Sequence, residues 1–232
     1  MIIETILFDF DGTLAELHID FDEMKQRIAQ IAAPYLGHHP KPSAIPALEW
    51  IDWIAQQFQH GKSALAPAFR SQALASIEAM EMEAALRGKL FSFTRPMLQN
   101  LHRRGVQIAV VTRNCARAVR TVFPDGERLG IHLFARDHVR RVKPDPHHLH
   151  TALKALDASP FHTLMVGDHP LDIETGKRAG VRTAGVASGR VSLMDLHACH
   201  PDWVAQDCAA LVSLLDAGQF LPKESIYGTH FA

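Results

Sequence analysis

The 232-residue sequence predicts an α/β protein: a parallel-sheet core with an inserted all-helical cap domain. Two observations predict this fold. After residue 93, short apolar runs alternate with stretches of helical periodicity, which is typical of a parallel, Rossmann-like sheet with right-handed crossovers. Between the first apolar run and this alternating region lie about eighty residues with only helical spacing. We therefore expect core residues 1–14 and 93–217, a cap at 15–92 and an unassigned tail at 218–232.

Five apolar runs are predicted to form the strands of the core. The first, Ile2 to Phe8, flows into a turn at Gly12. The others are Val106–Val111, Leu133–Ala135, Thr163–Gly167 and Arg182–Val186. Helices are expected to open at Pro96, at Asp145-Pro146 and after Asp168, with a last helix over Ala209–Leu215.

The cap shows three stripes of apolar residues at spacings of three and four, which predict three helices and no strand. Asp20, with Glu23 three residues later, resembles a capping box at the start of the first helix. We expect Trp50 and Trp53 to pack rather than bind substrate, although one of them could do both. The stripes are Phe21, Met24, Ile28, Ile31 and Tyr35; Leu48, Ile51, Ala55 and Phe58; and Phe69, Ala73, Ile77, Met80 and Ala84.

The composition argues against several classes of protein. A net charge of −1 gives no electrostatic footprint for a nucleic acid or an anionic membrane. Cys115, Cys199 and Cys208 form no CxxC pair, which fits a reducing cytoplasm. No segment has the length of a membrane span, and no basic region near Glu4 indicates a signal peptide, so we expect a cytoplasmic location.

Fifteen histidines include three clusters that lack the spacing of a zinc site. We expect them to lie on the surface. They are His38-His39, His147-His148-His150 and His197-Cys199-His200.

Polar side chains follow three of the predicted strands. Asp9 and Asp11 follow the first, Thr112 follows the second, and Asp168 follows the fourth. Because the carboxyl ends of parallel strands meet at one edge of a sheet, these residues are expected to converge there. Lys143 and Asp172 can reach the same edge. Paired carboxylates and a tight turn suit metal-assisted nucleophilic chemistry on an anionic substrate.

These residues form four motifs that together resemble the haloacid dehalogenase superfamily of phosphotransferases with a helical cap. The likeness covers residues 2 to about 190, and the motifs stand in the family's order. They are Asp9-Phe10-Asp11-Gly12-Thr13, Val110-Val111-Thr112-Arg113-Asn114, Val142-Lys143-Pro144-Asp145-Pro146 and Gly167-Asp168-His169-Pro170-Leu171-Asp172.

The resemblance implies roles for the carboxylates. Asp9 is the nucleophile that forms an aspartyl-phosphate, and Asp11 is the general acid and base, with a pKa raised relative to Asp9. Mg²⁺ is the implied cofactor. Its ligands are Asp9, Asp168 and the Asp11 carbonyl, with Asp172 as an outer-shell or alternate ligand.

The resemblance also implies how phosphate is held. Lys143 neutralises charge on Asp9 and on phosphate, while Thr112 offers its hydroxyl and Arg113 and Asn114 their amides. Gly12 permits the turn after Asp9, and Thr13 braces that turn by a hydrogen bond. His169 either contacts metal-bound water or is simply exposed.

The implied activity is that of a phosphatase of the phosphoglycolate phosphatase type, acting on a small phosphorylated metabolite. The stretch Ala15–His18 differs from the Asp-Ser common in phosphoglycolate phosphatases, which puts glycolate in doubt. A phosphomutase of the β-phosphoglucomutase type keeps the same motifs, and a catalytically silent phosphate-binding module stays an alternative. Asp11 disfavours a dehalogenase or phosphonatase.

The cap is expected to open for substrate and close to exclude water, with hinges near 14–19 and 88–95. Candidates for gripping the non-phosphate end of the substrate are Glu16, His18, Lys62 and Arg70. A monomer and a homodimer both fit the sequence.

Overall fold

The computed structural model describes residues 2–58 and 63–223. They belong to two compact units: a core unit drawn from Met1–Leu17 and Gly88–Ala232, and a helical unit, His18–Arg87. These limits lie a few residues inside the cap expected over 15–92. The chain passes from the core unit to the helical unit after Leu17 and returns to the core unit at Gly88.

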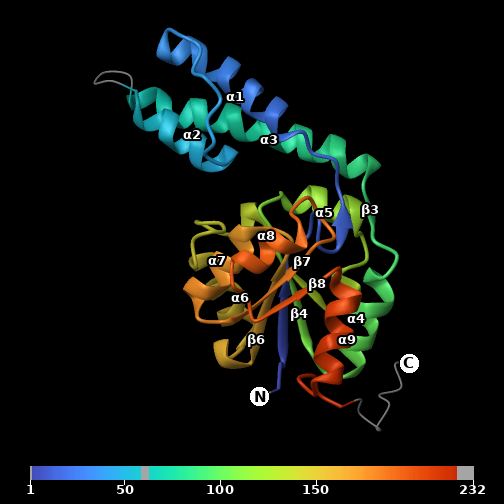
Figure 1. The fold of residues 1–232 in the computed structure, drawn as a ribbon. Helices are drawn as coiled ribbons and strands as arrows, with labels where there is room; N and C mark the ends of the chain where they lie inside the picture. The colour runs from blue at the N-terminus through green and yellow to red at the C-terminus, as the bar shows by residue number, and fades with distance from the viewer. Residues whose placement is uncertain (1, 59–62, 224–232) are drawn as a thin grey trace. The chain divides into compact units, whose positions relative to one another are not determined.

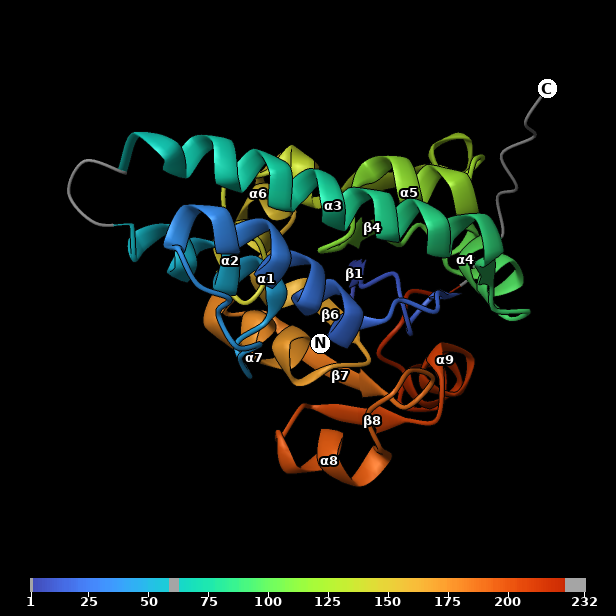
Figure 2. The ribbon, with the colours of Figure 1, turned by 90° about the horizontal axis from the view of Figure 1, so that it is seen from above.

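The core unit contains a six-stranded parallel sheet in the order β5-β4-β1-β6-β7-β8. Seen from above, β1 lies between β4 and β6 (Figure 2). Because every neighbouring pair is parallel, the carboxyl ends of all six strands share one edge. The strands are β1 Thr5–Phe8, β4 Gln107–Val111, β5 Ile131–Phe134, β6 Thr163–Gly167, β7 Arg182–Val186 and β8 Trp203–Ala205.

Helices cover both faces of this sheet (Figure 1). Helices α6 and α7 lie on one face, and α4 and α9 lie on the other. Leu7, Ala109 and Met165 of the central strands pack against Leu149 and Leu153 of α6 in the buried core. The helices are α4 Thr94–Arg103, α5 Ala116–Val122, α6 His147–Leu156, α7 Pro170–Ala179, α8 Leu193–Ala198 and α9 Cys208–Ala217.

The predicted α/β fold class is confirmed, and the predicted ranges of β6 and β7 match the structure. Strand β5 begins at Ile131, two residues before the predicted start, and α4 begins at Thr94 rather than Pro96. Helices α5 and α8 and strand β8 were not predicted. With seven, six and three residues respectively, these elements are too short to display a clear periodicity.

The helical unit contains α1 Phe21–Leu36, α2 Ala47–Gln56 and α3 Ala66–Arg87. The Asp20 carboxylate accepts from the amides of Asp22 and Glu23, so it caps α1 as the sequence predicts. Tyr35, Phe58 and Phe69 form an aromatic cluster with centroid separations of 5.4 to 5.6 Å. The unit is therefore held together by packing between its helices.

One expectation about residues 15–92, the absence of strands, was wrong. Strand β2, Ala15–Glu16, pairs antiparallel with β3, Lys89–Leu90, and two-residue strands are too short for alternation to reveal them. Trp50 is fully buried as expected, but Trp53 is 46% exposed. Trp53 lines a groove of about 730 Å³ together with Tyr35 and Phe58.

Within residues 2–58 and 63–223, no helix combines the length and the apolar character needed to cross a membrane. The tail expected at 218–232 is described as far as Lys223. In that part, the Ile3 amide donates to the Phe220 carbonyl at 2.7 Å, and Leu221 is buried.

Candidate active site

Three aspartates meet at the carboxyl edge of the sheet. Asp9 follows β1, and its amide donates to the Val166 carbonyl of β6 at 2.8 Å, which extends the strand pairing by one residue. Asp168 follows β6, and Asp172 lies in the first turn of α7. One carboxylate oxygen from each of Asp9, Asp168 and Asp172 lies within 4.8 Å of the other two.

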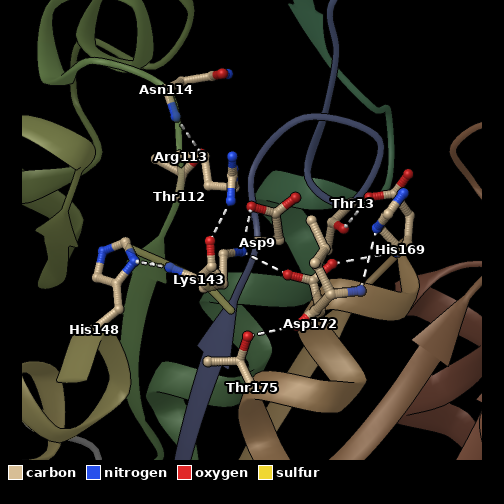
Figure 3. Close-up of polar contacts among 12 residues, drawn as sticks. Asp9, Thr13, Thr112, Arg113, Asn114, Lys143, His148, His169, Asp172 and Thr175 are labelled. Atoms are coloured by element: carbon tan, nitrogen blue, oxygen red, sulfur yellow. Dashed lines mark hydrogen bonds and ion pairs between the residues drawn. The ribbon is translucent and has the colours of Figure 1, made fainter. Parts of the chain in front are cut away.

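Lys143 lies between two of these carboxylates (Figure 3). Its Nζ donates to Asp9 Oδ1 at 2.7 Å and to Asp172 Oδ1 at 2.6 Å, and the residue is 1% exposed. Burial by itself would lower the pKa of Lys143, but the charges of Asp172 and Asp9 outweigh it and raise that pKa. The lysine is therefore a buried cation at functional pH.

Asp11 has a separate environment two residues beyond Asp9. Its Oδ1 accepts from the Leu17 amide at 3.0 Å. Burial, and then the charge of Asp9, raise the pKa of Asp11 to about 7. Near neutral pH this carboxyl can therefore both give and accept a proton. Burial also raises the pKa of Asp9, against the opposing charge of Lys143.

The carboxylates carry more negative charge than Lys143 neutralises. Burial, followed by the charges of Asp9, Asp172 and Asp11, raises the pKa of Asp168 to about 8. A divalent cation would relieve this repulsion, and clustered carboxylate oxygens are the ligands that Mg²⁺ prefers. The donor set of Asp9, Asp168 and Asp172 therefore fits Mg²⁺.

Glycines allow the backbone to approach Asp168 closely. Gly12 has a φ of +79°, and a Cβ there would lie 2.3 Å from Asp168 Oδ2. At Gly189, after β7, a Cβ would lie 1.8 Å from the same oxygen. Ser188 Oγ also donates to the Gly12 carbonyl at 2.7 Å, which links the two loops. Any side chain at Gly12 or Gly189 would displace the carboxylate.

Thr13 lies in the turn after Asp9, and its side chain is fully buried. Its hydroxyl donates to Asp168 Oδ1 at 3.4 Å. The hydrogen bond expected to brace its own turn is therefore directed to Asp168 in the described structure.

The residues after β4 form a compact loop. The Asn114 amide donates to the Thr112 hydroxyl at 3.2 Å, so this amide, expected to bind phosphate, already has an acceptor. Within the described part of the chain, buried Asn114 Nδ2 has no hydrogen-bond partner. The Arg113 guanidinium donates through Nη1 to the Lys143 carbonyl. This loop therefore contacts the main chain of the buried lysine.

His169 caps helix α7, a role that the sequence did not reveal. Its Nδ1 accepts from the Leu171 amide at 3.1 Å, and its own amide donates to Asp172 Oδ2 at 3.2 Å (Figure 3). The second contact leaves Asp172 Oδ1 directed toward Lys143. His169 is exposed, and its cap helps to orient Asp172.

Surface placement was the wrong prediction for His148, which is fully buried. Its ring contacts the Lys143 amide and the Phe134 carbonyl. Two adjacent histidines at a helix start cannot share one face, and the spacing did not show which of His147 and His148 turns inward.

The four candidates for binding the rest of the substrate have different surroundings. Glu16 of β2 pairs with Lys89 at 3.4 Å. His18 is exposed at the start of the helical unit, and Arg70 Nε donates to Asp52 Oδ1 at 2.8 Å within that unit. Lys62 lies outside the described residues. Glu16 thus has a basic partner, and Arg70 has an acidic one.

The sequence analysis missed the loop Ser188-Gly189-Arg190. The loop contacts Gly12 and Asp168 as described above, and the charge of Arg190 acts to lower the pKa of Asp11. A signal for it was available, because the loop directly follows the predicted strand Arg182–Val186. That strand ends at the same edge of the sheet as β1 and β6.

A family model described as haloacid dehalogenase-like hydrolase matches residues 3–180. A curated relative, N-acetylmuramic acid 6-phosphate phosphatase of Pseudomonas putida, is 31% identical over 197 residues, covering 82% of this chain and 86% of its own. Pyrophosphatase PpaX of Anoxybacillus flavithermus is 28% identical, covering 93% and 98%.

Solved structures share the fold. A putative haloacid dehalogenase-like hydrolase from Bacteroides fragilis has a TM-score of 0.64 at 23% identity, covering 90% of this chain and 99% of its own. A putative phosphoglycolate phosphatase from Lactobacillus plantarum has a TM-score of 0.62 at 19% identity, covering 92% and 100%. With the family match over most of the chain, this places the protein among the haloacid dehalogenase-like hydrolases, and it is an enzyme of that family.

Proposed function

We propose that this enzyme is a Mg²⁺-dependent phosphatase that hydrolyses a small phosphate monoester through a phosphorylated Asp9. The observation that carries the proposal is the buried Lys143 ammonium, 2.7 Å from Asp9 and 2.6 Å from Asp172. It places a fixed positive charge beside a carboxylate at the open edge of the sheet. The phosphatase names of the curated relatives support the same class of reaction.

In the first half of the reaction, an Asp9 carboxylate oxygen attacks phosphorus and the bond from phosphorus to the ester oxygen breaks. Protonated Asp11 gives its proton to that leaving oxygen, so an alcohol departs. The pKa of about 7 supports this role, because a substantial protonated fraction exists at neutral pH.

In the second half, ionised Asp11 removes a proton from water, and the water oxygen attacks phosphorus. The bond between phosphorus and the Asp9 oxygen breaks, which releases inorganic phosphate and restores the Asp9 carboxylate. Asp11 is again protonated, so atoms and charges balance over the cycle. One carboxyl thus serves both steps.

Asp9, Asp168 and the Asp11 carbonyl would hold Mg²⁺, with Asp172 as an outer-shell or alternate ligand. The clustered carboxylate oxygens of Asp9, Asp168 and Asp172 support this assignment. When bound, the ion supplies positive charge to the carboxylates and to the phosphoryl oxygens. Lys143 Nζ would neutralise charge on the Asp9 carboxylate before attack and charge on the phosphoryl group afterwards. Because Gly12 and Gly189 have no Cβ, no side chain occupies the space that the Asp168 carboxylate needs.

Phosphoryl oxygens need donors beyond the lysine. Thr112 is buried after β4, and the Asn114 side-chain amide offers N–H groups without a partner among the described residues. We assign Thr112, Arg113 and Asn114 to the phosphate-binding loop. We assign to the side-chain amide of Asn114 the role that the family resemblance implied for its main-chain amide.

The relatives direct the choice of substrates for assay. A sugar 6-phosphate of the N-acetylmuramic acid type and pyrophosphate come from their names, and phosphoglycolate comes from a structural neighbour. We propose a phosphorylated small metabolite and rank the sugar phosphate first, because that relative has the higher identity over most of the chain.

The experiment is phosphate release from an aryl phosphate and from these phosphorylated compounds, with and without Mg²⁺, by wild type and Asp9→Asn. Wild type is expected to depend on Mg²⁺, and Asp9→Asn is expected to be inactive. Glu174→Gln, an exposed α7 residue paired with Arg178, is the control for handling and folding. Unchanged turnover by Asp9→Asn would contradict the proposal, and a requirement for a bisphosphorylated activator would indicate a mutase.

A further inference from the structure

His148 is the second residue of α6 and is fully buried. Its Nδ1 accepts from the Lys143 amide at 3.2 Å, and its Nε2 lies 2.9 Å from the carbonyl of Phe134, the last residue of β5. An amide can only donate and a carbonyl can only accept. The two contacts together therefore require one neutral tautomer, with the proton on Nε2 and none on Nδ1.

The surroundings of His148 keep that tautomer neutral. Burial is the largest cause, and the charges of Lys143, Arg113 and His147 act in the same direction, while the Phe134 carbonyl opposes them. Together they lower the pKa of His148 to about 3. A protonated ring would have no acceptor for the Lys143 amide, so neutrality and geometry agree.

The other side of Lys143 is held as well. The Arg113 guanidinium donates to the Lys143 carbonyl, and Arg136 Nη1 donates to the Arg113 carbonyl at 2.9 Å. The main chain of Lys143 is thus bound at its N–H by His148 and at its C=O by Arg113 (Figure 3). A fixed main chain gives the long lysine side chain a fixed origin.

We propose that His148 is a positioning residue, whose neutral imidazole holds the Lys143 main chain so that Nζ lies between Asp9 and Asp172. This inference rests on the proposed function for its effect on turnover, and on the contacts alone for its effect on Lys143. Displacing a charged group by about 1 Å in an active site can cost roughly a hundredfold in rate.

Two variants separate the two contacts of the ring. In His148→Asn, Oδ1 lies one bond from Cγ as Nδ1 does, so it can accept from Lys143 but the side chain cannot reach Phe134. In His148→Gln, the longer side chain brings an N–H group toward the Phe134 carbonyl and leaves no acceptor at the Nδ1 position. Both variants shrink a buried ring, so both are expected to lose stability. His150→Asn, exposed on the same helix, is the control.

We expect kcat with an aryl phosphate at saturating Mg²⁺ to fall roughly tenfold to a hundredfold in His148→Gln and much less in His148→Asn. A purely structural role would make kcat follow stability instead of the acceptor atom. Amide hydrogen exchange at Lys143 is measured in parallel. Protection of this amide is expected to persist in His148→Asn and to be lost in His148→Gln.

The exchange measurement separates the two proposals. If wild type releases no phosphate from any ester, the proposed function fails, while protection of the Lys143 amide still tests the role of His148. Equal loss of kcat in both variants, in proportion to their unfolding midpoints, would overturn the positioning role. So would unchanged Lys143 protection in His148→Gln.

Discussion

Asp11 illustrates how a single side chain obtains its chemistry from its position. A carboxyl in water has a pKa near 4 and is a poor proton donor at neutral pH. Burial and the adjacent Asp9 charge bring the pKa of Asp11 to about 7, and the Leu17 amide fixes one of its oxygens. The resemblance of the first motif to the haloacid dehalogenase superfamily suggests this role, whereas the pKa shift itself depends on the fold around Asp11.

Asp11→Asn is expected to fold and to lose proton transfer, because an amide oxygen still accepts from Leu17 but the side chain no longer titrates. The fall in kcat should be about a hundredfold to ten-thousandfold for an alkyl phosphate. It should be smaller for a nitrophenyl phosphate, whose leaving group needs no proton. Steady-state kinetics on both esters measures the ratio, and an equal fall on both would argue against general acid catalysis by Asp11.

At the scale of elements, loops from different strands hold one another in place. The loop after β7 contacts the loop after β1 through Ser188 and the Gly12 carbonyl, and it leaves no room for a side chain beside Asp168. Helix α7 contributes Asp172 and is capped by His169. The site therefore depends on contacts between elements far apart in sequence.

Gly189→Ala is expected to displace the Asp168 carboxylate, because its Cβ would otherwise lie 1.8 Å from Oδ2. We expect a higher Mg²⁺ concentration for half-maximal activity, by roughly tenfold to a hundredfold, which is the usual cost of disturbing the support of a metal ligand. Titration of activity with Mg²⁺ measures this. Gly126→Ala, whose Cβ would meet Phe123 at 3.3 Å, is the control, and an unchanged Mg²⁺ requirement in Gly189→Ala would contradict the assignment.

The link between α6, β5 and Lys143 predicts a pH dependence of stability. The pKa of His148 is about 3 in the folded chain and 6.5 in the unfolded chain. The contribution of His148 is therefore complete above pH 6.5 and falls by about 1.4 kcal/mol per pH unit toward pH 3. Urea unfolding of wild type and His148→Asn should give a stability difference that shrinks over this range, and a constant difference would contradict the low pKa.

For the whole molecule, the sequence was sufficient to predict the α/β fold class. The apolar runs at Thr163–Gly167 and Arg182–Val186 predicted β6 and β7. The end of the first run predicted that Asp168 would lie at the carboxyl edge of the sheet. The family resemblance supplied the roles. Short elements such as α8 and β8 were not predicted, because tertiary packing stabilises them and they are too short to show periodicity.

Side-chain partners were harder to predict than elements. The inward turn of His148 and the cap at His169 depend on the angle at which α6 and α7 leave the sheet, and residue spacing does not specify that angle. Arg113 was expected to offer its main-chain amide to phosphate and Arg70 its side chain to the substrate; the Arg113 side chain contacts the Lys143 carbonyl and that of Arg70 contacts Asp52. Arginine spacing alone does not distinguish a ligand-binding cation from one that stabilises a neighbouring loop.

Binding of Mg²⁺ to clustered carboxylates should stabilise the folded chain, because the unfolded chain lacks the site. At a concentration a hundredfold above the dissociation constant, the gain is about 2.7 kcal/mol. We expect the unfolding temperature of wild type and Glu174→Gln to rise with Mg²⁺. Asp168→Asn, which loses a ligand and also relieves repulsion, should show little rise from an equal or higher starting value. A full Mg²⁺ shift in Asp168→Asn would place the ion elsewhere.

Covalent capture of the phosphoryl group provides the most direct test of the account. Enzyme quenched in acid during turnover of an aryl phosphate is digested, and its peptides are examined by mass spectrometry. The expected result is one added phosphoryl group on the peptide that contains Asp9, absent from Asp9→Asn. Steady phosphate release with no label on that peptide, or with the label on another residue, would contradict nucleophilic catalysis by Asp9.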